Sequence, residues 1–453
     1  MADKPQLFGT DGVRGVAGQP PLDPATIWRL GFAIGSVLGR ESARRSGSVV
    51  LGEDTRESSA WISRTLASGL KASGVEVTYA GVITTPGVAF LARHHGFAAG
   101  IMVSASHNPY EDNGIKVLSS SGMKLPESME LAIERSLESA AAPADAARAH
   151  ALVPSSQLLD DYVDYLVGLG GEPARLARLK VMADCAHGAA SRVAPQVFQR
   201  LGIAAHILHA EPTGRNINLE CGSLHPQKMS NGTKSSAADL GVAFDGDADR
   251  ALFATREGHI ADGDCVLYAC ARHFHEHGKL RGDHVVGTLM TNLGLEVALK
   301  PFGIGLKRTA VGDKYVLEEM MRSGMNLGGE PSGHIIFSDV SLAGDGLITM
   351  LQMLRLLAEK GQPLHVLIEG LRQFPQLIHN VRVREKLPLD SLPSVVEAID
   401  HSRAEFGDRG RVVVRYSGTE KLARVMVEAE DAAAVERHTR QIAEAIEKAI
   451  GAK

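Results

Sequence analysis

The chain has 453 residues, of which 44% are hydrophobic and 22% are charged, and its formal net charge at pH 7 is −5. This length exceeds what one hydrophobic core supports, so about three or four domains are expected. The weakly acidic balance lacks the basic excess that nucleic-acid binding requires, and no apolar run approaches the ~20 residues of a membrane-spanning helix.

The N-terminal residues contain no apolar segment of the signal-peptide type. Four cysteines, at positions 185, 221, 265 and 270, lack the CxxC spacing of a zinc site and the pattern of a disulfide framework. Such cysteine usage is typical of a reducing cytosol. We therefore expect a cytoplasmic globular protein that binds neither nucleic acid nor a membrane.

Short β-branched runs alternate with longer helical patterns through most of the chain. This alternation predicts βαβ units with mostly parallel sheets, in which ligands collect at the carboxyl ends of the strands. Strands are predicted at residues 48–54, 75–82, 99–106, 179–186, 240–247 and 284–290, and helices at 25–42, 62–74 and 194–202.

Changes in pattern at three places indicate domain boundaries. An Ala-rich stretch with two prolines covers residues 138–156, and a hairpin-like segment covers 247–263. After residue 373 the pattern changes to antiparallel strands and a helix at 432–450. We predict three successive α/β domains with mixed sheets, residues 1–155, 156–255 and 256–373, plus a smaller C-terminal α+β domain, residues 374–453.

The segment VSASHNP, residues 103–109, ends a predicted strand in polar, turn-forming residues. Asn-Pro marks a turn, and serine and asparagine side chains often bond to their own backbone where a strand ends. Taken alone, the segment fits a structural turn as well as a reactive loop around Ser106.

The segment FDGDADR places Asp245, Asp247 and Asp249 at alternate positions directly after an apolar run. Alternate residues of an extended or looping chain face one side, so the three carboxylates are expected to converge. Hard oxygen ligands of this kind suit Mg²⁺, which is usually held by a few carboxylates and a phosphate oxygen. An EF-hand is excluded, because Arg250 and Arg256 stand where that loop requires Gly and Glu. A solvated acidic turn is the alternative to a metal site.

Two later segments combine groups that bind sugars and phosphates. LGGEPSGH, residues 327–334, carries Glu330 and Ser332, which can hydrogen-bond hydroxyl groups, and His334, which can move a proton near neutral pH. RYSGTEKLAR, residues 415–424, has hydroxyls, a glycine backbone and arginines, which are the parts of a phosphate-binding loop. Each segment fits a plain turn equally well when taken alone.

A phosphate on Ser106 would carry about −2 charge at neutral pH. Together with three aspartates and one Mg²⁺ it would leave a net charge of roughly −3, and a phosphorylated substrate would add more. Such a site requires nearby cations. The segments supply five of them: Arg14, Lys116, Arg250, Arg415 and Arg424.

Seven segments, in order and across almost the whole chain, resemble those of the α-D-phosphohexomutase superfamily. The ordered set is highly specific, whereas no single segment is. Among the members, the chain is most similar to bacterial enzymes that convert glucosamine 6-phosphate to glucosamine 1-phosphate. The segments are FGTDGVRG, SASHNPYEDNGIK, NINLECGSLHP, FDGDADR, VGDKYVLEEM, GGEPSGH and RYSGTE.

The resemblance implies four domains around a central cleft, and it makes Ser106 a phosphoserine. The phosphoserine gives its phosphoryl group to the substrate, and the bisphosphorylated sugar that forms reorients and returns its other phosphate. The product feeds UDP-N-acetylglucosamine and cell-wall precursor synthesis. The resemblance also implies a sugar 1,6-bisphosphate as activator, sugar phosphates as the small-molecule partners, and a monomer or homodimer.

The resemblance assigns a role to each candidate site residue. One Mg²⁺ per active site is held by an oxygen on Ser106 and by Asp245, Asp247 and Asp249. The acid/base and electrostatic residues are Lys116, His334 and Arg14. The residues that bind the substrate are Glu330 and Ser332 at the sugar hydroxyls, Arg250, and, at the non-reacting phosphate, Arg415, Ser417, Gly418, Thr419 and Arg424.

Four residues depart from the family's pattern: Pro331 stands for Gln, Lys421 for Pro, Glu53 for Arg and His187 for Asn. Pro331 bears on sugar choice. A phosphomannomutase/phosphoglucomutase with the same mechanism is the nearest alternative, followed by a Mg²⁺-dependent phosphatase and by a sugar-phosphate-binding protein without activity. The intact serine, aspartates and basic segments weigh against the last of these.

Overall fold

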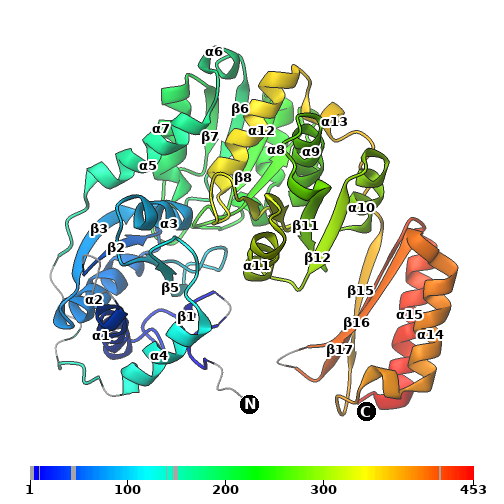
Figure 1. The fold of residues 1–453 in the computed structure, drawn as a ribbon, viewed down its shortest axis with the longest axis horizontal. Helices are drawn as coiled ribbons and strands as arrows, with labels where there is room; N and C mark the ends of the chain where they lie inside the picture. The colour runs from blue at the N-terminus through cyan, green and yellow to red at the C-terminus, as the bar shows by residue number, and fades with distance from the viewer. Residues whose placement is uncertain are drawn as a thin grey trace. The chain divides into compact units, whose positions relative to one another are not determined.

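The computed structural model describes residues 5–9, 11–41, 47–138, 140–144, 146, 151–417 and 420–452. The chain divides into two compact units (Figure 1): residues 1–289 with 307–369, and residues 290–306 with 370–453. Among the described residues, no helix combines the length and the apolar character that crossing a membrane requires.

The first sheet of the larger unit has the strand order β1-β5-β4-β2-β3. β2 (Ser48–Glu53) runs parallel to β3 (Glu76–Val82) and to β4 (Ala99–Val103). β5 (Asp112–Ser119) is antiparallel to β4 and to β1 (Val13–Val16). The sheet is therefore mixed, and the segment around Ser106 leaves it at the carboxyl end of β4.

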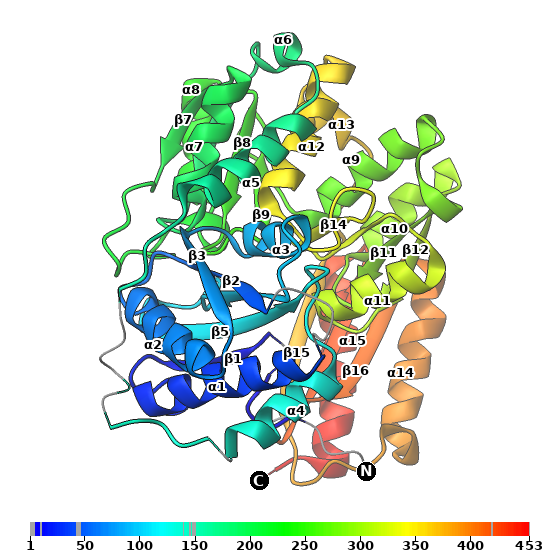
Figure 2. The ribbon, with the colours of Figure 1, turned by 60° about the vertical axis from the view of Figure 1, so that its left-hand side comes forward.

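Helices cover both faces of this sheet (Figure 2). Val49 and Leu51 of β2 join the core that the sheet shares with α1 (Pro24–Glu41), α2 (Ser59–Ala72) and α4 (Glu127–Glu138). Side chains alternate along a strand, so Gly52 faces the other side. There an added Cβ would come within 2.5 Å of Val88 on α3 (Thr85–His94). Glycine thus allows α3 to lie close against the sheet.

The second sheet has the order β10-β9-β8-β6-β7. β6 is parallel to β7 and β8, and β9 is antiparallel to β8 and β10. Its strands are β6 (Lys180–Asp184), β7 (Ala204–Leu208), β8 (Leu240–Phe244), β9 (Ala251–Ala254) and β10 (Ile260–Ala261). The helices of this region are α5 (Ser156–Leu169), α6 (Pro173–Leu176), α7 (Ala190–Leu201) and α8 (Gln227–Ser236).

The third sheet has the order β12-β11-β13-β14, in which β11 and β13 are parallel and β13 and β14 form an antiparallel pair. Its strands are β11 (His284–Thr288), β12 (Gly305–Thr309), β13 (Leu327–Gly329) and β14 (Ile335–Phe337). The helices here are α9 (Gly263–Glu276), α11 (Asp313–Ser323), α12 (Gly346–Lys360) and α13 (Leu364–Leu367).

The smaller unit contains an antiparallel sheet of the order β15-β17-β16. Its core is built from alternate valines of the strands and from apolar residues of two helices. The elements are α10 (Leu293–Leu299), β15 (Gln376–Arg382), α14 (Pro393–Phe406), β16 (Gly410–Tyr416), β17 (Leu422–Ala429) and α15 (Ala432–Ile450).

The predicted fold class is confirmed: three α/β regions with mixed sheets precede a smaller α+β region. All six predicted strands are shorter in the structure. β4 ends at Val103 and β8 at Phe244, for example, and the polar residues that follow belong to loops. Residues 13–16, which were not predicted as a strand, form β1 because they pair with β5. The three domain boundaries stay a prediction.

Candidate active site

Asp245, Asp247 and Asp249 lie in the loop that follows β8. One carboxylate oxygen of each lies within 4.8 Å of the corresponding oxygens of the other two. Asp245 and Asp247 are buried, and the Asp249 side chain is 14% exposed. The loop turns sharply at Ala248, whose φ is +57°. The structure therefore brings the three carboxylates together, as their alternation in the sequence predicts.

Ser106 lies in the loop after β4, with a left-handed backbone at φ +52°. Its hydroxyl donates a hydrogen bond of 2.6 Å to Asp245 Oδ2, and its backbone N–H donates to Ser104 Oγ at 2.9 Å. Ser104 in turn donates to Asp54 Oδ2 at 2.6 Å. Of the two serines, Ser106 faces the carboxylate cluster and Ser104 supports the loop.

Two buried side chains hold the backbone of the Ser106 loop. The carbonyl oxygen of Ser106 accepts hydrogen bonds from Arg56 Nη2 and Asn218 Nδ2, each at 2.9 Å. Arg56 also donates to Asn108 O at 2.8 Å and to Asp54 Oδ2 at 2.9 Å. The sequence analysis did not single out Asn218. Its presence in the family segment NINLECGSLHP was the one signal that pointed to it.

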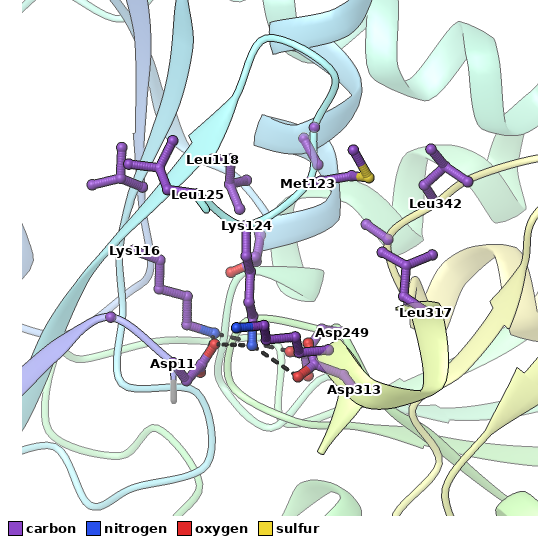
Figure 3. Close-up of a pocket in the computed structure, with 18 of the residues that line it drawn as sticks. Asp11, Lys116, Leu118, Met123, Lys124, Leu125, Asp249, Asp313, Leu317 and Leu342 are labelled. Atoms are coloured by element: carbon purple, nitrogen blue, oxygen red, sulfur yellow. Dashed lines mark hydrogen bonds and ion pairs between the residues drawn. The ribbon is translucent and has the colours of Figure 1, made fainter. Parts of the chain in front are cut away.

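Lys116 on β5 joins the first sheet to the carboxylate cluster (Figure 3). Its Nζ lies 2.8 Å from Asp247 Oδ2, 3.0 Å from Asp11 Oδ2 and 3.9 Å from Asp249 Oδ2. Thr85, the first residue of α3, donates a further hydrogen bond of 2.5 Å from Oγ1 to Asp247 Oδ2. Asp247 is thus fixed by two elements of the first sheet region.

Asp11 is an acceptor shared by several cations. Besides its contact with the buried lysine, it pairs with Arg14, and its Oδ1 lies 3.0 Å from Lys124 Nζ. Lys124 Nζ also lies 2.8 Å from Asp313 Oδ1 at the start of α11 (Figure 3). Arg14 contacts Ala105 O at 3.4 Å. Arg14 was a predicted site residue, whereas Asp11, its acidic partner, was not.

His334 and Arg250 flank Asp249. His334 Nδ1 lies 3.7 Å from Asp249 Oδ2, and its Nε2 lies 4.0 Å from Asp313 Oδ2. Arg250 Nε lies 3.8 Å from Asp249 Oδ1, and its backbone N–H donates to Asp245 Oδ1 at 3.2 Å. The structure places both predicted residues beside the cluster.

Glu330 and Ser332 lie in the turn between β13 and β14. Glu330 Oε1 accepts a hydrogen bond of 3.1 Å from the Gly312 N–H, whereas Ser332 Oγ has no partner among the described residues. The turn packs directly on the aspartate loop, since the Ala251 N–H donates to Gly333 O at 3.1 Å. Both predicted sugar-binding residues therefore belong to a turn that is fixed next to the cluster.

Arg415, Ser417 and Arg424 lie in the smaller unit. Arg415 and Arg424 are direct cross-strand partners on β16 and β17. Ser417 O accepts a hydrogen bond of 2.6 Å from Lys386 Nζ, and the Ser417 N–H donates to Leu422 O. The predicted residues Gly418 and Thr419 lie outside the described residues.

The carboxylate cluster fits a small divalent cation. Burial raises the pKa of the Asp245 carboxyl well above its ordinary value, and the charges of Asp249 and Asp247 raise it further. Burial acts in the same direction on Asp249, but the contact with His334 and the charge of Lys116 outweigh it and hold that pKa below its usual range. Asp247 Oδ1 and Asp249 Oδ1 are buried and accept no hydrogen bond from the described residues. Unpaired carboxylate oxygens at this spacing are the ligands that Mg²⁺ prefers.

A cavity of about 530 Å³ adjoins the cluster (Figure 3). Lys116, Asp249 and His334 belong to its charged lining. Apolar side chains line another part of it, among them Leu118, Met123, Leu125, Leu317 and Leu342. This volume lies in the range of small-molecule pockets. A small molecule in the cavity would therefore reach the candidate site.

Profiles of the Phosphoglucomutase/phosphomannomutase family match four stretches of the chain: alpha/beta/alpha domain I at residues 5–144, domain II at 160–258, domain III at 262–374 and the C-terminal domain at 379–445. The phosphoglucosamine mutase of Koribacter versatilis is 50% identical over 459 residues, which cover 99% of this chain and 98% of that protein. The chain belongs to the phosphoglucosamine mutase family.

Two further comparisons agree with this membership. The phosphoglucosamine mutase of Solibacter usitatus is 48% identical over 445 residues, covering 98% of this chain and 99% of that protein. A solved structure, the phosphoglucomutase/phosphomannomutase family protein of Burkholderia thailandensis, matches with a TM-score of 0.78 and 25% identity, covering 98% of this chain and 97% of that chain. The superfamily resemblance of the ordered segments is confirmed.

In the metal-free protein, the pKa values of two histidines at the site should be shifted in opposite directions from the ordinary value. Burial lowers the pKa of His334, but the contact with Asp249 and the charge of that carboxylate outweigh burial and raise the pKa. Burial lowers the pKa of His107, and the charges of Arg250 and Arg14 lower it further. NMR titration of the imidazoles should find His334 above and His107 below about 6.5, the ordinary value.

The Asp249→Asn variant should lower the pKa of His334, because it removes the charge that holds the proton. Protonated His334 stabilises the fold below about pH 6.5, and this contribution is lost as the pH rises through the raised folded-state pKa. A His334 that titrates below its ordinary value in the metal-free wild type would contradict the ion pair with Asp249.

Proposed function

We propose that this chain interconverts glucosamine 6-phosphate and glucosamine 1-phosphate as a phosphoglucosamine mutase, an isomerase that transfers a phosphoryl group within its substrate. The nearest alternative is the same reaction on glucose or mannose phosphates. The observation that carries the proposal is the contact between the Ser106 hydroxyl and Asp245 Oδ2 at 2.6 Å, inside a cluster of three carboxylates. High identity to phosphoglucosamine mutases over almost their whole length supports the choice of sugar.

Ser106 is the proposed phosphoryl carrier. In the forward half-reaction the bond between phosphorus and Ser106 Oγ breaks, a bond to the sugar hydroxyl forms, and the hydroxyl proton passes to a base of the site. The bisphosphorylated sugar then reorients, and its other phosphoryl group returns to Oγ. A phosphate monoester of serine persists between turnovers, and a sugar 1,6-bisphosphate is the proposed activator that restores it. The buried Arg56 and Asn218 fix the Ser106 carbonyl, so Oγ keeps its place.

Asp245, Asp247 and Asp249, together with an oxygen on Ser106, are the proposed ligands of one Mg²⁺. When bound, the ion would stabilise charge on the transferring phosphoryl group and orient it. Lys116 and Thr85 already fix Asp247 Oδ2, which leaves its other oxygen, Oδ1, for a ligand role.

Lys116, His334 and Arg14 are the proposed acid/base and electrostatic residues. Burial lowers the pKa of Lys116, but the charges of Asp11 and Asp247 outweigh it and raise the pKa above its ordinary value. Lys116 therefore stays protonated at neutral pH and serves as a charged donor. His334 exchanges protons near neutral pH, so it is the better proton carrier of the two. Arg14 adds positive charge beside the Ser106 loop.

The remaining residues are proposed to bind the substrate. Glu330 and Ser332 are proposed to bind sugar hydroxyls, and Ser332 Oγ has no hydrogen-bond partner among the described residues. Arg250 lies beside the carboxylate cluster and is proposed to bind the reacting phosphate. Like charges that face each other across two strands destabilise a sheet, so the Arg415–Arg424 pair favours an anion between the two side chains. The proposed ligands of the non-reacting phosphate are Arg415, Ser417, Gly418, Thr419 and Arg424. The cytoplasmic location and the monomeric or homodimeric state stay predictions.

A coupled assay with three substrates tests the activity. The kcat/KM for glucosamine 6-phosphate should exceed the values for glucose 1-phosphate and mannose 1-phosphate, and little inorganic phosphate should be released. A preference for glucose or mannose phosphate would refute the amino-sugar assignment and leave the phosphoserine chemistry intact. Phosphate release at the rate of substrate loss would instead identify a phosphatase.

A pair of serine variants tests the phosphoryl carrier. Ser106→Ala should lower kcat by about 10³-fold or more, because no neighbouring group can carry the phosphoryl group. Ser104→Ala should lower kcat by about 100-fold at most, since it removes two supporting hydrogen bonds worth roughly 0.5–1.5 kcal/mol each and leaves the phosphoryl carrier in place. Mass spectrometry of the wild type should find the phosphate on Ser106, and a phosphate on Ser104 would refute the assignment.

A pair of aspartate variants tests the metal ligands. Asp247→Asn should raise the Mg²⁺ concentration for half-maximal activity by at least about tenfold, because it weakens an oxygen ligand. Asp313→Asn makes the same charge change nearby without touching the three-carboxylate cluster, so it should have a smaller effect. Full turnover after exhaustive EDTA treatment would show that the cluster needs no metal.

A further inference from the structure

A second group of potential metal ligands lies outside the carboxylate cluster, at the end of the second sheet. Asp184 is the last residue of β6, His209 follows β7, and Cys221 precedes the short helical turn Gly222–Leu224. One ligand atom from each of the three side chains lies within 4.8 Å of the other two. Asp184 and Cys221 are almost completely buried, and the His209 side chain is 19% exposed. The group therefore has one side that a solute can approach.

The contacts around the three side chains fix the group from several directions. His209 Nδ1 lies 2.9 Å from Asp184 Oδ2, and that carboxylate also accepts a hydrogen bond of 3.1 Å from the Gly222 N–H. Its other oxygen accepts from the Ala186 N–H at 2.8 Å. The neighbouring His187 has a buried Nδ1 that has no hydrogen-bond partner among the described residues. Its ring centroid lies 5.1 Å from that of His209.

The backbone around the group is held in conformations that side chains normally avoid. Ala186, His187, His209 and Glu220 all have φ between +49° and +53°. Gly222 has φ +69°, and an added Cβ there would meet Phe244 O and Ala186 Cβ at 2.5 Å. Such positions cost of order 1–3 kcal/mol each and persist where the surrounding structure fixes them, often at functional sites. The strained positions thus lie beside the three ligands, directly after β6 and in the segment 209–222.

The donor set has the chemistry of a zinc site. Zn²⁺ takes thiolate, imidazole and carboxylate ligands at about 2.0–2.3 Å, and three protein ligands leave a fourth position open. Binding would replace the thiol proton of Cys221, which leaves to solvent, by a bond from sulfur to the metal. One carboxylate and one thiolate balance the charge of the ion, so the buried complex would be neutral. Mg²⁺ prefers oxygen ligands only, so the two sites differ in selectivity.

We propose that Asp184, His209 and Cys221 form a second, non-catalytic metal site that binds Zn²⁺ or a similar borderline-soft divalent cation. Water or the neighbouring His187 would supply the fourth ligand. The absence of CxxC spacing argues only against sites with paired cysteines. Here the ligands come from the end of a strand and from the two ends of the segment 209–221, with a single cysteine, a combination that leaves no spacing signature in the sequence.

The proposed site lies next to the loop that holds Ser106. The Asn218 N–H donates to Ala186 O at 2.9 Å, and the Asn218 side chain donates to the Ser106 carbonyl at 2.9 Å. Thr55 Oγ1 also donates to His187 O at 2.6 Å. A metal that ties the end of β6 to both ends of the segment 209–221 would therefore stiffen the support of Ser106 without touching the substrate.

Cobalt provides a direct test, since Co²⁺ takes zinc sites and a thiolate ligand gives it an intense charge-transfer absorption in the near ultraviolet. The full-length chain is freed of metal with a chelator and titrated with Co²⁺. The band should saturate at about one ion per chain, survive in Asp247→Asn and disappear when Zn²⁺ is added. An oxygen-only site cannot produce this band, so the carboxylate cluster cannot mimic the result.

Matched variants decide which thiol is involved. Cys221→Ser should abolish the band, whereas Cys185→Ala and Cys270→Ala, which change buried cysteines outside the group, should retain it. If Cys221→Ser does not fold, His209→Gln provides the second test, because it should raise the Kd for Zn²⁺ at least about tenfold. A wild type without the band, or an unchanged band in Cys221→Ser, would overturn the proposal and leave a metal-free contact.

Discussion

The structure depends on bringing three carboxylates within 4.8 Å of one another in a largely buried place. Like charges at this distance repel strongly when water is excluded, so the fold must supply positive charge and donors from elsewhere. Lys116 supplies both from the middle of β5, and Thr85 adds a hydroxyl from the start of α3. The aspartate loop of the second sheet is therefore held by the first sheet. A cation bound to the carboxylate oxygens that accept no hydrogen bond from the described residues would compensate the rest of the negative charge.

The parts of this arrangement that are local in sequence could be predicted. Asp245, Asp247 and Asp249 alternate directly after an apolar strand, and alternation is enough to place their side chains on one side of a loop. Ser106 follows an apolar run that could only be a buried strand, and polar residues at a strand's carboxyl end are placed for ligands. The alternating β and α patterns likewise specified the α/β regions, because side-chain period distinguishes a strand from a helix.

Other parts depend on contacts between distant residues, and no pattern in the sequence other than the family segments marks them. Asp11 contacts Lys116 and Lys124, but a single aspartate in a glycine-rich stretch has no local feature that distinguishes it from a surface charge. Asn218 reaches the Ser106 carbonyl across 112 positions of chain. The segment that forms the β13–β14 turn fits a plain turn when taken alone, and its packing on the aspartate loop follows from the tertiary fold. In each case, the packing of helices and strands determines which distant residue makes the contact.

The positive φ of Ser106 has a consequence for which amino acid can occupy that position. Threonine carries the same hydroxyl and could form the same phosphate ester. Its branched Cβ, however, makes a left-handed backbone a true outlier, with an energetic penalty of roughly 1–2 kcal/mol. Arg56 and Asn218 bind the Ser106 carbonyl and prevent the loop from relaxing into another conformation. The backbone thus selects between two alcohols that the chemistry alone would treat as equivalent.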